Sequence, residues 1–223
     1  MIQMEIGFNI LYLITIYLLV GLMIRRYRSK DYENLPGSAS FLLAFLLLAV
    51  GDTGHVGFRL LAFSRGGLEA NEVLVGLGAL ATAITITLFY MLMIDVWRKQ
   101  ARVKQSWLFV VVLLTGIIRF VIMTLPENTW GQVVPPFKFS LIRNSFLILM
   151  GILVVYAFLK DGRLLKNTFL NRSALAVIIS FACYIPVILF VQKAPMIGML
   201  MIPKTIAYVF LAVIGYRRLF IRS

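Results

Sequence analysis

Charged side chains inside apolar stretches are the residues of this sequence with the clearest chemical potential. Six ionisable residues lie well inside long apolar runs: Asp52, His55, Arg59, Arg119, Arg143 and Lys204. A charge near the centre of a bilayer costs roughly 2.5–3.5 kcal/mol even on the lenient insertion scale, so such side chains normally face a partner or a wet cavity. Several of them in one short chain predict a common site.

Three of these residues fall within the short segment 51–59. At 100° per residue along a helix, Asp52, His55 and Arg59 lie within about 60° of one another, so one helix face carries all three. Other faces of the same segment carry glycine at positions 51, 54 and 57, which lets neighbouring helices approach closely. This pattern predicts a helix inside a bundle.

The charges of the six residues do not balance. Asp52 can pair with Arg59 or Lys204, but one carboxylate cannot neutralise three arginines and a lysine. A carboxylate, a phosphate or a lipid headgroup from outside the chain is the simplest compensating anion, and arginine's planar fork suits it. The expected ligand-binding residues are Asp52, His55, Arg59, Arg119, Arg143, Asn144, Lys204 and Tyr208, where Asn144 adjoins Arg143 and Tyr208 lies one turn from Lys204.

Alternatives without a soluble ligand remain open. Asp52 can form a buried salt bridge that only holds helices in register, and the long arginine stems can reach the headgroup layer. A lipid-modifying enzyme is another alternative, with Asp52 orienting His55 as general base and arginines holding a phosphate. One histidine and one cysteine, Cys183, cannot supply the usual zinc ligand sets, so neither a metal nor a cofactor is expected.

Seven apolar runs must position these side chains. They span 6–24, 39–63, 73–96, 106–125, 138–159, 173–192 and 195–216, and each can cross a bilayer as a helix of about 20 residues. The chain is 61% hydrophobic and 14% charged with a mean hydropathy of +0.94, whereas a soluble domain is about half apolar and a quarter charged. We therefore predict an all-α integral membrane protein: a single domain, 1–223, forming one bundle of seven transmembrane helices.

Lysine and arginine are distributed unequally between alternate loops. Fifteen of the 22 follow the first, third, fifth and seventh runs, at positions 25, 26, 28, 30, 98, 99, 102, 104, 160, 163, 166, 172, 217, 218 and 222. The other loops hold Arg65 and Lys193, with Lys138 at a helix boundary. Because cytosolic loops are enriched in these residues, the N-terminus is predicted outside and the C-terminus in the cytosol, in the cell membrane. The net charge of +13 comes from the same excess of lysine and arginine in the cytosolic loops, so no nucleic-acid partner is expected.

The tryptophans agree with this orientation. Trp97 and Trp107 fall at predicted cytosolic helix ends and Trp130 in the longest outer loop, and indole rings favour such interfacial depths. That loop, 126–137, contains two consecutive prolines and is expected to form an irregular cap.

The predicted topology also gives depths. Asp52, His55 and Lys204 come near mid-membrane, and the three arginines come in the outer half. We therefore expect one basic cavity open to the outside, which binds an anionic solute or a lipid headgroup for transport or sensing. Membrane lipids and an anionic small molecule are the expected partners.

A receptor-like sensor is a further possibility. Seven helices, an external N-terminus and Lys204 within Pro-Lys-Thr-Ile-Ala-Tyr of the last run superficially resemble the microbial rhodopsins. The resemblance implies that Lys204 would hold retinal. It covers only the architecture and one residue, since the third run has no carboxylate at its middle to act as counter-ion and no tryptophan lies at mid-depth.

Overall fold

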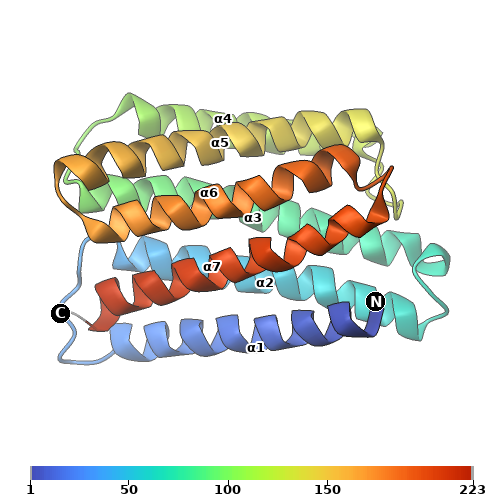
Figure 1. Cartoon of the computed structure of the whole chain (residues 1–223), viewed down its shortest axis with the longest axis horizontal. Helices are drawn as coiled ribbons and strands as arrows, with labels where there is room; N and C mark the ends of the chain where they lie inside the picture. Colours follow the sequence, from blue (N-terminus) through green and yellow to red (C-terminus); the bar gives the residue numbers. More distant parts are fainter. Residues whose placement is uncertain (1, 222–223) are drawn as a thin grey trace.

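The chain folds into seven long α-helices that lie side by side. The computed structural model describes residues 2–221, with side chains from Gly7 onward. The helices are α1 (Ile2–Tyr27), α2 (Ser38–Ser64), α3 (Glu72–Gln100), α4 (Trp107–Thr124), α5 (Phe137–Leu164), α6 (Thr168–Phe190) and α7 (Met201–Tyr216). Short helical turns complete the described part: η1 (Glu69–Asn71), η2 (Pro126–Asn128), η3 (Pro195–Leu200) and η4 (Arg217–Ile221). Figure 1 shows the long helices aligned along one axis, with the chain termini at opposite ends.

All seven predicted apolar runs are confirmed as helices that are long and apolar enough to cross a membrane. The helices α3 and α5 continue beyond their runs, because helical hydrogen bonding does not stop where the apolar residues stop. Each ends close to a residue with left-handed backbone, Arg102 (φ 56°) and Lys166 (φ 51°), a conformation that cannot continue a right-handed helix. The seventh run starts with the 3₁₀-helical turn η3 before α7 begins.

Most of the basic residues lie at one end of the bundle, in the connections and in the helix ends that adjoin them. Residues 28–37, 101–106 and 165–167 and the turn η4 lie together there, at the left of Figure 1. We call this the basic end. Of the fifteen basic residues noted above, Arg222 lies outside the described residues. The loops 65–71, 125–136 and 191–200 lie at the opposite end, with the N-terminus.

Small residues bring α2 and α3 into close contact. A Cβ atom added to Gly51 would overlap the Thr85 side chain, and one on Gly54 would come within 3.1 Å of Ala81 Cβ. Thr82 Oγ1 also donates a hydrogen bond to the Gly51 carbonyl (3.1 Å) across this contact. The expectation for Gly57 is wrong, because nothing lies within 4 Å of a Cβ added there. That glycine faces away from α3.

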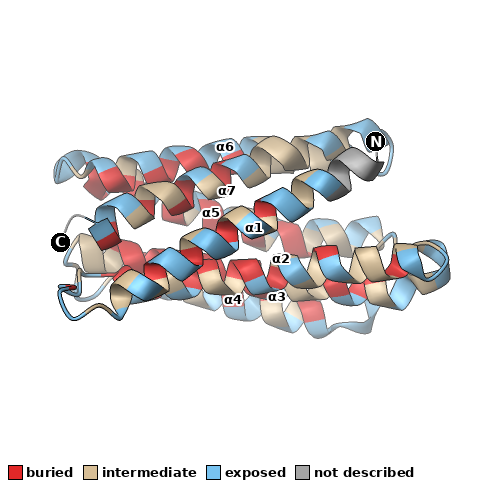
Figure 2. Ribbon diagram, turned by 90° about the horizontal axis from the view of Figure 1, so that it is seen from below, coloured by how far each residue is buried: buried red, intermediate tan, exposed pale blue. Residues whose placement is uncertain are grey.

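Aromatic rings fill the middle of the bundle. Phe89 packs edge-on against Phe45 (centroids 5.3 Å apart) and against Tyr208 (5.4 Å). The hydroxyls of Tyr90 and Tyr208 form a hydrogen bond of 2.8 Å. Figure 2 shows the buried residues along the inward faces of the helices, and α1 crossing the bundle obliquely. The aromatic layer separates the basic end from the half of the bundle that holds the site described below.

The α2–α3 contact gives a first prediction. Gly51→Ala should lower the free energy of unfolding by about 1–3 kcal/mol, because the added methyl group would overlap Thr85 in a packed interface. Gly57→Ala should leave stability unchanged or raise it by up to about 1 kcal/mol, the helix-propensity difference. Thermal unfolding of purified protein in one detergent measures both. Equal stability of the two variants would contradict close packing at Gly51.

Candidate functional site

All eight residues predicted from the sequence line one internal cavity. Its volume is about 660 Å³, within the range of roughly 300–1,000 Å³ common for ligand sites. Loop residues Trp130, Pro195 and Met199 also line it, so the cavity lies in the half of the bundle opposite the basic end. The expected convergence of these side chains on one cavity is confirmed. Their binding of a ligand stays a prediction.

Arg119 is almost completely buried and hydrogen-bonds across three helices. Its Nε donates to the backbone carbonyl of Arg143 on α5 (2.9 Å), and its Nη1 donates to the carbonyl of Ala83 on α3 (2.7 Å) and to Thr87 Oγ1. Only 1% of the residue is exposed, so the alternative of a stem reaching toward a headgroup layer is wrong for Arg119. These bonds give it a structural role that the sequence did not indicate. Its Nη2 has no acceptor among the described residues.

Arg143 connects the cavity to the loop after α4. Its Nη1 donates to Asn128 Oδ1 (3.0 Å), and its guanidinium carbon lies 4.5 Å from the ring centroid of Trp130. Asn128 is fixed in turn by its own amide, which donates to the carbonyls of Ile122 (2.6 Å) and Leu125 (3.1 Å). Arg143 is 7% exposed, and its Nε and Nη2 have no acceptor in the described part of the chain. These donors are available to an anion in the cavity.

Lys204 rests on an aromatic ring. Its Nζ lies 4.3 Å from the ring centroid of Tyr184 on α6, a cation–π contact worth roughly 0.5–2 kcal/mol. The Tyr184 hydroxyl donates to Asn144 Oδ1 of α5 (3.2 Å). Tyr184 therefore links α5, α6 and α7. None of the three ammonium donors has a hydrogen-bond acceptor among residues 7–221.

Asp52 forms no hydrogen bond or ion pair with the described residues expected from the sequence. We expected His55, Arg59 or above all Lys204 as its partner. The structure instead has the Tyr12 hydroxyl of α1 donating to Asp52 Oδ2 at 2.6 Å, and Asp52 forms no ion pair with Lys204 among the described residues. Sequence reasoning missed Tyr12, because the apolar run 6–24 carries no charged residue and the rotation of α1 toward α2 is not a local property.

His55 lines the cavity but has no hydrogen bond to Asp52. Its Nδ1 is buried without a hydrogen-bond partner in the described chain, while Asp52 is bonded to Tyr12. The two side chains share a helix face as predicted, yet successive side chains on a face need not touch. The arrangement required for a catalytic dyad is therefore not formed. Arg59 and Tyr208 line the same cavity, with Tyr208 bonded to Tyr90 at its inner boundary.

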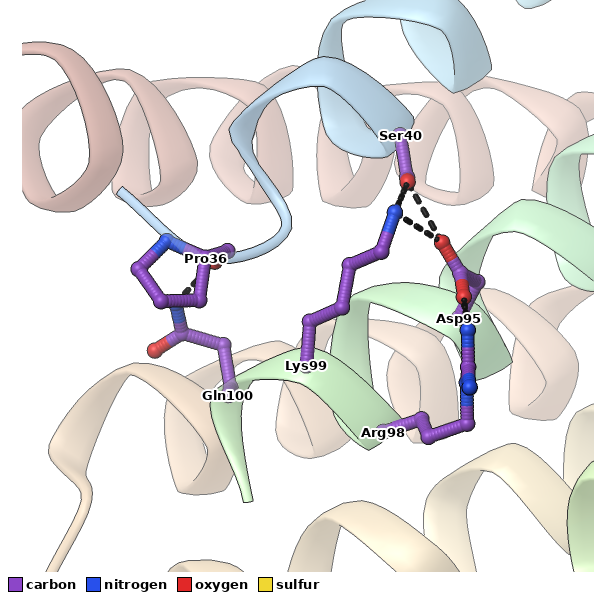
Figure 3. Close-up of polar contacts among 6 residues, drawn as sticks. All are labelled: Pro36, Ser40, Asp95, Arg98, Lys99 and Gln100. Carbon is purple, nitrogen blue, oxygen red and sulfur yellow. Dashed lines mark hydrogen bonds and ion pairs between the residues drawn. The ribbon is translucent and has the colours of Figure 1, made fainter. Parts of the chain in front are cut away.

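A second polar cluster lies near the basic end, around Asp95 of α3. Figure 3 shows Ser40 Oγ donating to Asp95 Oδ2 (2.6 Å), with Lys99 Nζ 2.7 Å from the same oxygen. Arg98 donates through Nε (3.2 Å) and Nη2 (2.7 Å) to Oδ1. Sequence reasoning missed Asp95 as a residue of interest, although basic residues three and four positions later predict such helix pairs. This cluster ties α2 to α3 and lies apart from the cavity.

Two tryptophans differ from their predicted environment. Trp97 is only 2% exposed, and its Nε1 donates to Asp161 Oδ2 (2.8 Å) inside the bundle. Trp130 donates to the Met123 carbonyl (2.9 Å) and stacks with Arg143, so it belongs to the cavity wall. Trp107 is 65% exposed, in agreement with an interfacial position.

The hydrogen bonds of Arg119 give a second prediction. Arg119→Met should lower the free energy of unfolding by roughly 2–5 kcal/mol, since three interhelical hydrogen bonds contribute up to about 1.7 kcal/mol each. Thr87→Val removes one acceptor and should cost about 1 kcal/mol. Both effects are measured by thermal unfolding in the same detergent. An Arg119→Met variant as stable as the wild type would exclude a structural role for these bonds.

Comparison of the chain with protein-family models, with curated proteins and with solved structures found no match to any of them. The functional conclusion therefore depends on the chemistry of the cavity.

Proposed function

We propose that the chain is a multi-pass membrane protein whose cavity binds an anionic group, for transport or sensing. The observation that carries the proposal is the charge of the cavity lining. Arg119, Arg143 and Lys204 are brought together with one carboxylate, Asp52, among the described residues that line the cavity. None of the three cations has an ion-pair partner among the described residues.

The available hydrogen-bond donors support an oxyanion as ligand. Arg143 keeps its Nε and Nη2, and Lys204 keeps its ammonium donors, on the lining of one cavity. Carboxylate and phosphate oxygens accept such charge-assisted bonds strongly, at about 2.7–2.9 Å. Arg119 contributes charge more than donors, because it already bonds to α3 and α5.

The alternatives have weaker support. The lipid-modifying enzyme relied on Asp52 orienting His55, and that contact is absent between these two described residues. For the retinal-type sensor, Lys204 does line a cavity with Asp52, but the ring beside its amine is Tyr184. Anion binding uses each of the buried basic groups and needs no further reactive residue.

Membrane orientation is the first test of this proposal. Reporter fusions after Lys30, Lys104, Lys166 and the C-terminus should all report the cytosol, because these positions belong to the basic loops. Fusions within 65–71 and 125–136 should report the outside. A cytosolic signal from either of those two loops would place the cavity toward the wrong compartment and contradict the orientation.

Ligand binding is tested with inorganic phosphate, glycerol 3-phosphate and succinate as probes. A bound anion should raise the stability of the purified protein by RT ln(1 + [L]/Kd), about 2.7 kcal/mol at a hundredfold excess over Kd. Arg143→Gln or Lys204→Gln should abolish this rise, because each removes a charged donor from the cavity. Differential scanning fluorimetry gives the shift in Tm.

Lys138→Gln is the matched control, since Lys138 is an exposed cation on α5, the helix that carries Arg143. It should retain the full shift. Arg119 is a poor test residue, because its loss also removes interhelical bonds. If no probe shifts Tm in the wild type, or if Arg143→Gln and Lys138→Gln respond alike, the anion-binding proposal fails.

A further inference from the structure

A groove runs along the outside of the bundle between α1 and α2. Its volume is about 600 Å³. Residues along its length are Ile10, Ile14 and Leu18 of α1 and Val56, Gly57 and Leu60 of α2. Its two hydroxyl groups, on Tyr17 and Thr53, hydrogen-bond to each other at 2.9 Å, and Thr53 also donates to the Ala49 carbonyl (2.7 Å). An apolar occupant would therefore meet no unsatisfied polar side chain. We call this the α1–α2 groove.

The groove and the charged cavity share a wall. Val56 lines both. On α2, Asp52 and His55 face the cavity while Thr53 and Gly57 face the groove, within little more than one helical turn. On α1, Tyr12 faces the cavity and Ile14 the groove. The contact between α1 and α2 therefore separates the cavity from the α1–α2 groove.

We propose that the anion bound in the cavity is the headgroup of a membrane lipid, whose acyl chain passes between α1 and α2 at Val56 and lies in the α1–α2 groove. This inference rests on the proposed function and names its ligand class. From Ile10 to Leu18 the groove follows α1 for about 12 Å, most of the roughly 15 Å hydrocarbon depth of one leaflet. Its length and apolar lining fit an unbranched alkyl chain.

The continuity at Val56 favours a lipid over a soluble anion. A soluble anion would contact only the cavity and would leave the adjoining groove without a role. A lipid reaches the cavity from the side, since the groove lies on the face of α1 and α2 that is turned away from the bundle. Gly57 keeps that space open, because nothing lies within 4 Å of a Cβ added there.

Two probes with the same phosphate headgroup test the proposal. Glycerol 3-phosphate has no acyl chain, whereas oleoyl lysophosphatidate has one, and native mass spectrometry of the purified full chain measures the affinity for each. The wild type should bind the lysophosphatidate more tightly. Gly57→Leu fills the groove and leaves the cavity lining intact, so it should weaken lysophosphatidate binding about tenfold or more, the effect of displacing about two methylene groups. Its affinity for glycerol 3-phosphate should not change.

Gly21→Leu is the matched control. Gly21 also lies on an exposed helix face with nothing within 4 Å of an added Cβ, but outside the groove. This variant should bind both probes as the wild type does. Ile14→Trp, from the facing wall, should reproduce the effect of Gly57→Leu and serves in its place if the latter fails to fold.

The outcomes separate the two proposals. If Gly57→Leu and Ile14→Trp bind lysophosphatidate as tightly as Gly21→Leu does, the acyl chain lies elsewhere and the groove inference is overturned. Equal affinity of the wild type for the two probes also overturns it, because the ligand is then a soluble anion. In both cases the proposal that the cavity binds an anion would still stand if Arg143→Gln no longer bound the probes. If the wild type binds neither probe, both proposals fail.

Discussion

A buried guanidinium is the constraint on which one half of this bundle depends. Arginine stays charged in a protein interior, and its donors need acceptors wherever water is excluded. Arg119 meets this need with the backbone carbonyls of Ala83 and Arg143 and with the hydroxyl of Thr87. Because carbonyls belong to the helix backbone, these bonds set the spacing of α3, α4 and α5 themselves. The wall of the cavity that carries Arg143 is positioned by this requirement.

The opposite wall depends on a different kind of contact. The helices α2 and α3 approach closely because Gly51 and Gly54 have no side chain, and the resulting register directs Asp52 and His55 toward the cavity. Tyr12 then attaches α1 to this pair through its hydrogen bond to Asp52. An aromatic layer of Phe45, Phe89 and Tyr208 closes the space toward the basic end.

The chain stabilises the cations on its helices in two ways, with different consequences. Around Asp95, Arg98 and Lys99 both pair with one carboxylate, which offsets one of their two positive charges. In the cavity, Arg119, Arg143 and Lys204 are held by carbonyl groups, an amide and aromatic rings. Those partners are neutral, so they stabilise a cation without removing its charge. A cavity built this way retains positive potential, which is the property that anion binding requires.

The sequence alone determined the number of helices and much of the candidate site. Apolar runs of about 20 residues mark helices, because helical hydrogen bonds are local, and the helical period placed Asp52, His55 and Arg59 on one face. The antiparallel order of the runs gave the depths at which Arg119, Arg143 and Lys204 would converge, and all of these residues line one cavity. Only the tertiary structure decided which groups touch. Tyr12 replaced Lys204 as the partner of Asp52, carbonyl groups took the place of an anion at Arg119, and Trp97 turned toward Asp161. Such pairings depend on how each helix is rotated about its axis and on which helices lie next to it. Because apolar residues occupy nearly every face of these helices, hydropathy does not distinguish the inner face of a helix from its outer face.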